Sequence, residues 1–589
     1  MSTPSILSAI QKLRSLLTRE EKFKWLGIVG FAMCTSLLEV LTASVIVVFA
    51  QVLNQPELGQ KYLAMLGFDA DLSPSRIVSY VSIIVGVVYL IKNMVSGVEV
   101  FYQNFAIQKM NYQFKNKLLH CYAESDYGLY LTRNSSLGLQ VVGSDAELIF
   151  SSGMVPLATI LSEGVVFLFL IGLVIVINPS LALAIFGIGA VLGFGITKGL
   201  LPRFYRFGQK LQEAVLYSSQ NLIQFFHGFK EIVLLGKRDA FINAYQYHSL
   251  KKSRVQAIQT AINSLPRMVI EVLFMGLFVT TISLLCLKHE SPLQMIGILS
   301  GYLYAGFRLM PGLNRIVNQL SIFKSIIPSI ERVHTEYNTV ANKENYVDVP
   351  EFVFAEVVSL KDINFCYLNT KKDALTDISL TINKGECIGI VGETGSGKST
   401  LVDVILGLLK PYQGSVLVDE KFPVYSYQWH QKIGYVPQSV YLVDDTIEAN
   451  IAFGEQKIDQ RKLNKAIDAA QLRKYIDQLP LGLRTIVGER GIRLSGGERQ
   501  RIAIARALYR DPEVLIFDEA TSALDNETES RLMDTIHAVS QNRTVIMIAH
   551  RLTTLKGCTR IVVMESGKIK ELITYSSLNN LSQRESNYV

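Results

Sequence analysis

The sequence has few charged residues and few cysteines for its 589 residues, and each shortage excludes a class of protein. Charged residues make up 19% of the chain, whereas a soluble domain typically carries about 25%. Hydrophobic residues reach 49%, which excludes a disordered chain and argues against a wholly soluble enzyme. The six cysteines lie far apart, without a CxxC pair or a His/Cys cluster, so the sequence supports neither a zinc site nor a disulfide framework.

Positive charge is also modest, because the net charge of +7 is spread over the whole chain. This argues against a nucleic-acid partner and favours basic loops that face anionic lipid. The first 24 residues have no short apolar core followed by a cleavage site, so we do not expect a signal peptide. Their apolar residues recur with helical spacing among lysines and arginines, which predicts an interfacial helix on the cytoplasmic side.

Six mostly apolar stretches are each long enough to cross a bilayer, which needs about 20 residues. They cover about 25–52, 77–101, 154–177, 181–201, 266–287 and 293–313. The long connections 102–153 and 202–265 contain few helix breakers and predict helices that continue far into the cytosol. Buried core helices of a large soluble protein are the alternative, but six such stretches with a consistent charge asymmetry in their loops disfavour it.

Loop charges predict the orientation, because cytoplasmic loops are enriched in lysine and arginine. The segment 202–265 contains nine such residues, whereas the outer loop 53–76 has three acids against Lys61 and Arg76. Both termini are therefore expected on the cytoplasmic side. The short stretch 54–68 lies in this outer loop. It is either a short external helix with Tyr62, Leu63 and Leu66 facing lipid, as a family resemblance given below implies, or simply an amphipathic loop.

Ionisable residues within the spans are costly in a membrane and often functional. Four cations stand out as candidates to line a cavity for an anionic substrate: Lys92, Arg267, Arg308 and Arg315. The alternative is structural: they pair with Glu39, Glu163 or Glu271, or extend to the interface.

The remaining chain predicts a charged linker over 331–355 and an α/β nucleotide-binding domain over 356–589, after a membrane domain over 1–330. A buried strand, 386–391, runs into a loop of the pattern GxxxxGK[ST] and then a helix. In this motif backbone N–H groups surround phosphates, Lys398 reaches the β- and γ-phosphates, and Ser399 supplies a hydroxyl to Mg²⁺. The expected ATP-binding residues are Gly392, Glu393, Thr394, Gly395, Ser396, Gly397, Lys398, Ser399 and Thr400.

A second apolar strand, 514–518, ends in Asp518 and Glu519. Asp518 suits the Mg²⁺ shell, and Glu519 is placed to orient or deprotonate an attacking water. Between the two strands, Ser495, Gly496 and Gly497 precede a helix whose free N–H groups can meet an anion. By themselves these three residues are more often an ordinary helix cap.

Together these motifs resemble those of ABC transporters, and the order of six spans before one nucleotide-binding domain resembles a half-size type IV exporter. The resemblance implies that Tyr367 stacks on adenine and that Gln438 touches Mg²⁺. It also places Asp525 in the D-loop and implies that His550 contacts the γ-phosphate. Glu498 departs from the family's usual glutamine. Because one copy's Ser495–Gly497 caps ATP held by another copy, the resemblance implies a homodimer, with coupling helices near Tyr127–Ser136 and Phe225–Gly236.

The run FRLMPGLNRI around Arg308 and Arg315 resembles the PglK-type lipid-linked oligosaccharide flippases. That resemblance predicts ATP-driven flipping of a polyprenyl-pyrophosphate-linked glycan across a bacterial inner membrane, for protein glycosylation or glycan assembly. Alternatives are an exporter of another lipid of the lipid A type, a multidrug exporter, and an ATP-gated channel or regulatory subunit.

Overall fold

A computed structural model describes residues 4–578 with gaps at 55, 66–72, 178–192, 288–291, 342–346, 348, 369, 520–528 and 550, and at ten positions between 531 and 542. The described chain divides into two units: residues 1–124 and 134–342 form the first, and 125–133 and 343–589 form the second. The short segment 125–133 therefore belongs with the C-terminal half, although 209 residues separate the two in sequence.

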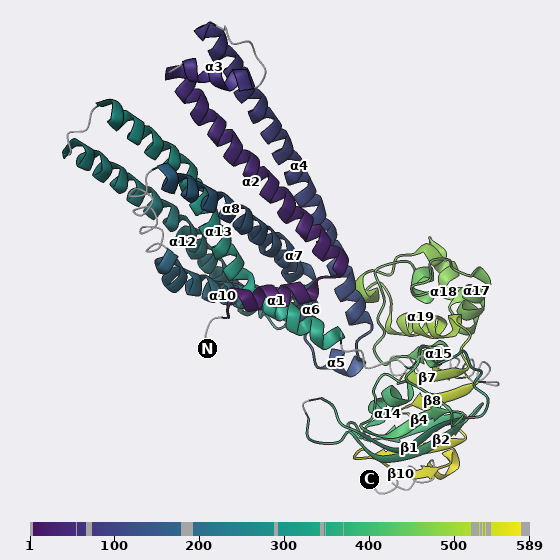
Figure 1. The fold of residues 1–589 in the computed structure, drawn as a ribbon. Coiled ribbons are helices and arrows are strands. Elements are labelled where there is room, and N and C mark those ends of the chain that lie inside the picture. Colours follow the sequence, from purple (N-terminus) through teal and green to yellow (C-terminus); the bar gives the residue numbers. More distant parts are fainter. Residues whose placement is uncertain are drawn as a thin grey trace. The chain divides into compact units, whose positions relative to one another are not determined.

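The first unit is entirely helical among its described residues (Figure 1). Its elements are α1 (Ile6–Leu16), α2 (Arg19–Asn54), α3 (Pro56–Met65), α4 (Pro74–Ala123), α6 (Ser135–Gln140), η1 (Val141–Asp145), α7 (Ala146–Ile149), η2 (Phe150–Met154), α8 (Val155–Ile177), η3 (Ile196–Leu200), α10 (Leu201–His227), α11 (Phe229–Leu234), α12 (Arg238–Leu287) and α13 (Pro292–Ala341). Long helices suit these sequences because a helix satisfies its own backbone hydrogen bonds where no water can.

The predicted spans can be compared with these helices. Those at 25–52, 77–101, 154–177, 266–287 and 293–313 fall on α2, α4, α8, α12 and α13, while the fourth, 181–201, lies mostly outside the described residues. In the described part, four helical stretches are long and apolar enough to cross a membrane, at Arg19–Ile46, Pro74–Ala123, Ser135–Phe169 and Arg238–Thr280. Helix α13 continues to Ala341, so the first part of the predicted linker is helical.

The predicted external helix forms as α3, but one of its side chains points differently from our expectation. Leu63 is only 1% exposed and packs with Val52, Ile77 and Val81 of α2 and α4. The prediction that Leu63 faces lipid is therefore wrong, because the ends of α2 and α4 offer it an apolar surface. The side chains of Tyr62 and Leu66 lie outside the described residues.

The second unit is an α/β domain with two sheets (Figure 1). The antiparallel sheet has the strand order β2-β1-β4-β5, and the larger sheet has the order β10-β9-β3-β8-β7-β6. The strands are β1 (Val357–Phe365), β2 (Leu375–Asn383), β3 (Cys387–Gly392), β4 (Gln413–Val418), β5 (Phe422–Pro423), β6 (Ile433–Val436), β7 (Val514–Asp518), β8 (Thr544–Ile548), β9 (Arg560–Glu565) and β10 (Lys568–Ile573).

The helices of this unit are α5 (Tyr127–Leu131), α14 (Lys398–Ile405), α15 (Tyr427–Gln431), α16 (Ile447–Ile451), α17 (Gln460–Ala469), α18 (Arg473–Gln478), η4 (Gly482–Arg484), η5 (Glu489–Gly491), α19 (Gly496–Tyr509) and η6 (Leu552–Leu555). All residues of β7 and β8 are buried, as expected for the middle of a parallel sheet that is covered on both faces. Because β3 and β7 run parallel, with β8 between them, their carboxyl ends meet at one edge. The predicted fold class is confirmed.

Helix α5 lies against the nucleotide-binding core rather than in the membrane unit. The Asp126 carboxylate caps it by accepting a hydrogen bond from the Gly128 N–H at 2.6 Å. Tyr127 packs on the core cluster that contains Leu409 and Trp429, and burial, followed by the charge of Asp403, raises the pKa of its phenol. Helices α5 and α11 coincide with the segments where coupling helices are expected.

Candidate functional site

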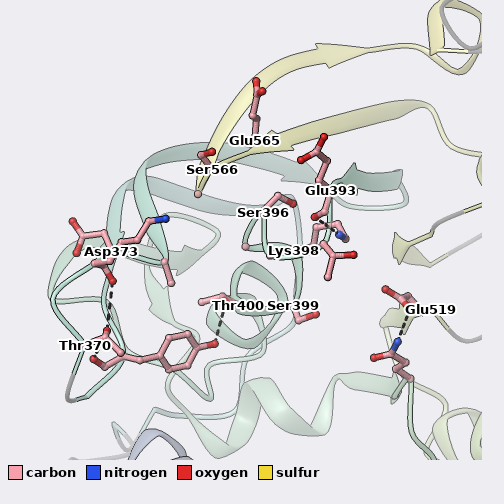
Figure 2. Close-up of a pocket in the computed structure, with 18 residues that line it drawn as sticks. Thr370, Asp373, Glu393, Ser396, Lys398, Ser399, Thr400, Glu519, Glu565 and Ser566 are labelled. Carbon is pink, nitrogen blue, oxygen red and sulfur yellow. Dashed lines mark hydrogen bonds between the residues drawn. The ribbon is translucent and has the colours of Figure 1, made fainter. Parts of the chain in front are cut away.

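The predicted phosphate-binding loop joins β3 to α14 and forms one wall of a cavity of about 690 Å³ (Figure 2). Its glycines are required by close backbone contacts. A Cβ at Gly392 would lie 2.3 Å from the carbonyl oxygen of Met564, and one at Gly397 would lie 2.9 Å from that of Ala374. Both residues also have positive φ, of 154° and 102°, which L-residues rarely adopt.

Lys398 begins α14 and is only 6% exposed. Its ammonium donates hydrogen bonds to the carbonyl oxygens of Gly392 and Glu393, both at 2.9 Å, so the charge is held inside the loop. The loop residues Glu393 to Gly397, together with Ser399 and Thr400, line the same cavity. A buried cation surrounded by a glycine-rich turn at a helix start is suited to bind phosphate groups.

Tyr367 lies on the cavity wall formed by the antiparallel sheet. Its hydroxyl and that of Thr400 are 2.9 Å apart, and its ring packs edge-on against Phe365 with centroids 5.0 Å apart. These contacts hold an aromatic ring beside the phosphate-binding loop, where it can stack on a base.

Asp518, at the end of β7, has a buried oxygen suited to bind a cation. Its Oδ2 accepts a hydrogen bond from the Tyr435 hydroxyl at 3.3 Å, whereas Oδ1 is buried without a hydrogen-bond partner among the described residues. Burial raises the pKa of the Asp518 carboxyl, and the charge of Glu519 raises it further. With the oxygens of Ser399 and Gln438, this unpaired carboxylate oxygen fits the all-oxygen coordination that Mg²⁺ prefers.

Glu519 follows Asp518 and lines the cavity together with Gln438. Its carboxylate accepts a hydrogen bond from the Gln438 amide at 2.5 Å (Figure 2). A carboxylate held this way at a phosphate-binding cavity can accept a proton from water. The other expected polar residues, Asp525 and His550, lie outside the described residues.

Ser495, Gly496 and Gly497 form the start of α19. Ser495 accepts a hydrogen bond from the Glu498 N–H at 3.3 Å, and Glu498 accepts one from the Ser495 N–H at 2.6 Å, which completes a capping box. Glu498 thus has a structural role in the motif where the family usually has glutamine. Among the described residues, none of these three lines the cavity next to this chain's own phosphate-binding loop.

Two of the four membrane cations share a second cavity, of about 660 Å³, between α12 and α13. Arg267 and Arg315 line it with the amide side chains of Asn263, Asn314 and Asn318. Each arginine is also paired with a carboxylate, as expected if these cations have a structural role. Nε of Arg267 lies 2.8 Å from Glu271, and Nε of Arg315 lies 2.7 Å from Glu163.

The other two cations, Lys92 and Arg308, are not among the described residues that line the cavity between α12 and α13. Lys92 is absent from the described lining, and its ammonium lies 5.9 Å from the centre of the Tyr89 ring. Arg308 lies on α13, but its side chain is outside the described residues.

Sequence reasoning missed several residues that line the two cavities. In the nucleotide site these include Lys372 and Asp373, and the turn Ser566–Gly567 between β9 and β10. A Ser-Gly pair between two apolar strands was the available signal for that turn. In the membrane cavity the missed residues include three asparagines. Two of them, Asn314 and Asn318, could have been found because they recur with helical spacing beside Arg315.

Comparisons with known proteins match both the nucleotide-binding unit and the helical membrane unit. The family model described as "ABC transporter" matches residues 375–522, and that described as "ABC transporter transmembrane region" matches residues 25–295. A relative named "ATP-dependent lipid A-core flippase", from Saccharophagus degradans, is 30% identical over 98% of this chain and 97% of its own length. The alpha-hemolysin translocation ATP-binding protein of Escherichia coli O157:H7 is 38% identical over 46% of this chain and 39% of its own length.

A solved structure entitled "Structure of a bacterial Atm1-family ABC exporter with ATP bound" has the same fold, with a TM-score of 0.76 at 21% identity. The similarity covers 95% of this chain and 97% of that one.

Proposed function

The chain belongs to the ABC transporters, as a half-size exporter that binds and hydrolyses ATP, and we propose that it flips a lipid with a phosphorylated saccharide headgroup, of the lipid A-core type. In this proposal the membrane is a bacterial inner membrane, with both termini on the cytoplasmic side. The working unit is a homodimer.

The cavity between α12 and α13 is the observation that carries this proposal. Arg267 and Arg315 use Nε for their carboxylate partners, which leaves the terminal NH₂ groups of each guanidinium to bind an anion. Such forked donors match phosphate oxygens, while the neighbouring asparagine amides suit sugar hydroxyls. Charged residues are costly in a membrane domain and often mark the path of a substrate.

The comparisons favour lipid A-core over the glycan that the PglK-type resemblance predicts. A polyprenyl-pyrophosphate-linked oligosaccharide carries the same combination of phosphate and sugar, so the cavity chemistry alone does not separate the two. A relative that is similar over nearly the whole chain is named for lipid A-core, and this name supports our choice of lipid A-core.

For the ATP site we propose that Lys398 and the loop amides bind the phosphates, that Tyr367 stacks on adenine, and that Glu519 takes the proton of the attacking water. Bound Mg²⁺, held by Asp518, Ser399 and Gln438, would neutralise phosphate charge. Ser495–Gly497 would complete the site of a second copy, because they do not line the cavity of their own chain. Asp525 and His550 keep the roles that the family resemblance gives them.

Reconstituted protein tests the substrate. In proteoliposomes we expect lipid A-core to stimulate ATP hydrolysis and to reach the opposite leaflet with ATP. A polyprenyl-linked glycan and a neutral phospholipid serve as comparison substrates. Arg267→Ala and Arg315→Ala are each expected to weaken the apparent affinity for the lipid about tenfold, the equivalent of about 1.4 kcal/mol.

Arg254→Ala is the matched control, because Arg254 is an exposed arginine on α12 that does not line the cavity. It should behave like the unmodified protein. Stimulation by the glycan alone would overturn the choice of lipid A-core. Unchanged lipid affinity in both cavity variants would overturn the cavity assignment.

A further inference from the structure

A separate groove of about 360 Å³ lies within the first unit, where α1 meets the starts of α2 and α8. Its apolar wall is built by Leu13 and Leu17 from the α1 region and by Met154 and Leu157 from the α8 region. Trp25 of α2 also lines it and donates a hydrogen bond from Nε1 to the carbonyl oxygen of Met154, at 3.4 Å. This bond fixes an indole ring at the groove, and tryptophan is typical of the interface between lipid and water.

Two cations, Arg14 and Lys22, line the same groove. Among the described residues neither forms an ion pair, whereas their basic neighbours do: Lys12 lies 3.2 Å from Glu331, and Lys24 lies 2.5 Å from Glu20. Glu21, which precedes Lys22 and is buried, accepts a hydrogen bond from the Thr18 N–H at 2.7 Å and forms no ion pair with either of these described cations. The groove therefore presents two cations that have no ion-pair partner among the described residues, beside an apolar wall.

The amphipathic pattern of α1 indicates which kind of ligand occupies the groove. Ala9, Leu13 and Leu16 are buried on one side of this helix, whereas Arg14 is exposed. A basic amphipathic helix of this kind lies in the plane of the membrane surface, at the depth of phospholipid headgroups. The volume is at the low end for small-molecule pockets, so it suits part of one acyl chain rather than a whole lipid.

We propose that this groove is a binding site for an anionic phospholipid of the cytoplasmic leaflet. Its phosphate lies between Arg14 and Lys22, and the first part of one acyl chain lies along Leu13, Leu17 and Leu157. The bound lipid joins α1 to α2 and α8, and so fixes the entrance of the chain into the membrane. The site is separate from the cavity between α12 and α13 and does not depend on which lipid is transported.

Native mass spectrometry of the full-length protein, released from nanodiscs, tests this site. The probe is phosphatidylglycerol mixed with phosphatidylcholine. We expect one phosphatidylglycerol to be retained per protomer. The double variant Arg14→Gln/Lys22→Gln should lower its affinity roughly thirtyfold, as the loss of two surface cations predicts. The matched control is Arg19→Gln/Lys109→Gln, which removes the same charge from exposed positions that do not line the groove.

A second variant, Leu157→Trp, keeps both cations and fills the apolar part of the groove; it should also release the lipid. The proposal is overturned if Arg14→Gln/Lys22→Gln retains phosphatidylglycerol as the unmodified protein does, or if the control loses it equally. Equal retention of phosphatidylcholine would overturn the assignment of an anionic headgroup.

Discussion

Among single residues, Glu519 has a backbone that few side chains adopt. Its φ of 49° lies in the left-handed region, where an L-residue costs about 1–2 kcal/mol. Its N–H donates a hydrogen bond to the carbonyl oxygen of Ile548 at 3.0 Å, so the neighbouring strand helps to hold this conformation. Strain of this kind is found at functional sites, which fits a carboxylate directed to the phosphate-binding cavity.

Replacing this carboxylate by an amide gives the first prediction. Glu519→Gln is expected to lower ATP turnover by about 10²–10⁴-fold, because the amide cannot accept the proton of the attacking water. ATP affinity should stay close to that of the unmodified protein, since Lys398 and the loop are unchanged. Steady-state hydrolysis and equilibrium nucleotide binding measure the two effects, with Glu571→Gln on β10 as a control. Ordinary turnover in Glu519→Gln would refute the role of a base.

Glu386 provides a prediction about pH. Burial raises the pKa of its carboxyl, but hydrogen bonds from Arg560 and from the Asn383 N–H outweigh this effect and hold the pKa below its usual value. A carboxyl with a lowered native pKa stabilises the fold at neutral pH, and that contribution is lost as the pH falls from about 4.3 through the native pKa. Glu386→Gln is expected to cost about 1–2 kcal/mol near pH 7, allowing for solvent screening at half-exposed Arg560.

Tryptophan fluorescence measures this loss. The sequence has two tryptophans, and Trp429 is fully buried in the nucleotide-binding unit, so a Trp25→Phe background leaves one reporter for that unit. The difference in Tm between Glu386→Gln and its parent should shrink as the pH is lowered below about 4.3. A difference that does not change with pH would show that the charge is not its cause.

Among single elements, α19 depends on the capping box between Ser495 and Glu498. Glu498→Ala is expected to lower the stability of the nucleotide-binding unit by about 1 kcal/mol, because it exposes the Ser495 N–H. Glu498→Gln should recover most of the loss, since an amide oxygen can accept the same hydrogen bond. The Trp429 reporter measures both variants. Equal loss in both would assign the effect to the negative charge at the helix start.

Helices α10 and α13 touch at Gly208, where a Cβ would lie 1.9 Å from the backbone oxygen of Ser325. Gly208→Ala is therefore expected to force the two helices apart, at a cost of about 1–3 kcal/mol. Gly97→Ala on α4 is the control, because a Cβ there meets nothing within 4 Å. Thermal denaturation of the detergent-solubilised protein, monitored by size-exclusion chromatography, should show a lower stability for Gly208→Ala than for Gly97→Ala. Equal stability of both variants would contradict the close contact.

For the whole molecule, the arrangement of the nucleotide site predicts complementation between two damaged copies. Lys398→Met damages the phosphate-binding loop, and Ser495→Arg damages the helix start proposed to face the other copy. A dimer with one of each keeps one intact composite site, so coexpression should restore part of the ATP hydrolysis that either variant alone lacks. No recovery in a verified mixed dimer would mean that each chain completes its own site.

Sequence analysis predicted those parts of the molecule whose interacting residues are close together in the sequence. The loop from Gly392 to Thr400 was predictable because its glycines, lysine and flanking strand are adjacent in sequence. The pair Arg267–Glu271 is also local, since the two residues lie four positions apart on α12. The partner of Arg315 was not predictable, since the sequence offered several acids and only the packing of α8 against α13 selects Glu163. The burial of Leu63 likewise depends on where the ends of α2 and α4 meet.

The assignment of α5 to the nucleotide-binding unit has a consequence for biosynthesis. Tyr127 leaves the ribosome 282 residues before Leu409, which belongs to the core on which it packs. At about 5–20 residues per second this interval is roughly 15–60 s. The core of the nucleotide-binding unit is therefore synthesised after α5, and it can bury Tyr127 only once Leu409 and its neighbours have been made. A chain that stops before Leu409 would leave α5 without the surface that buries Tyr127.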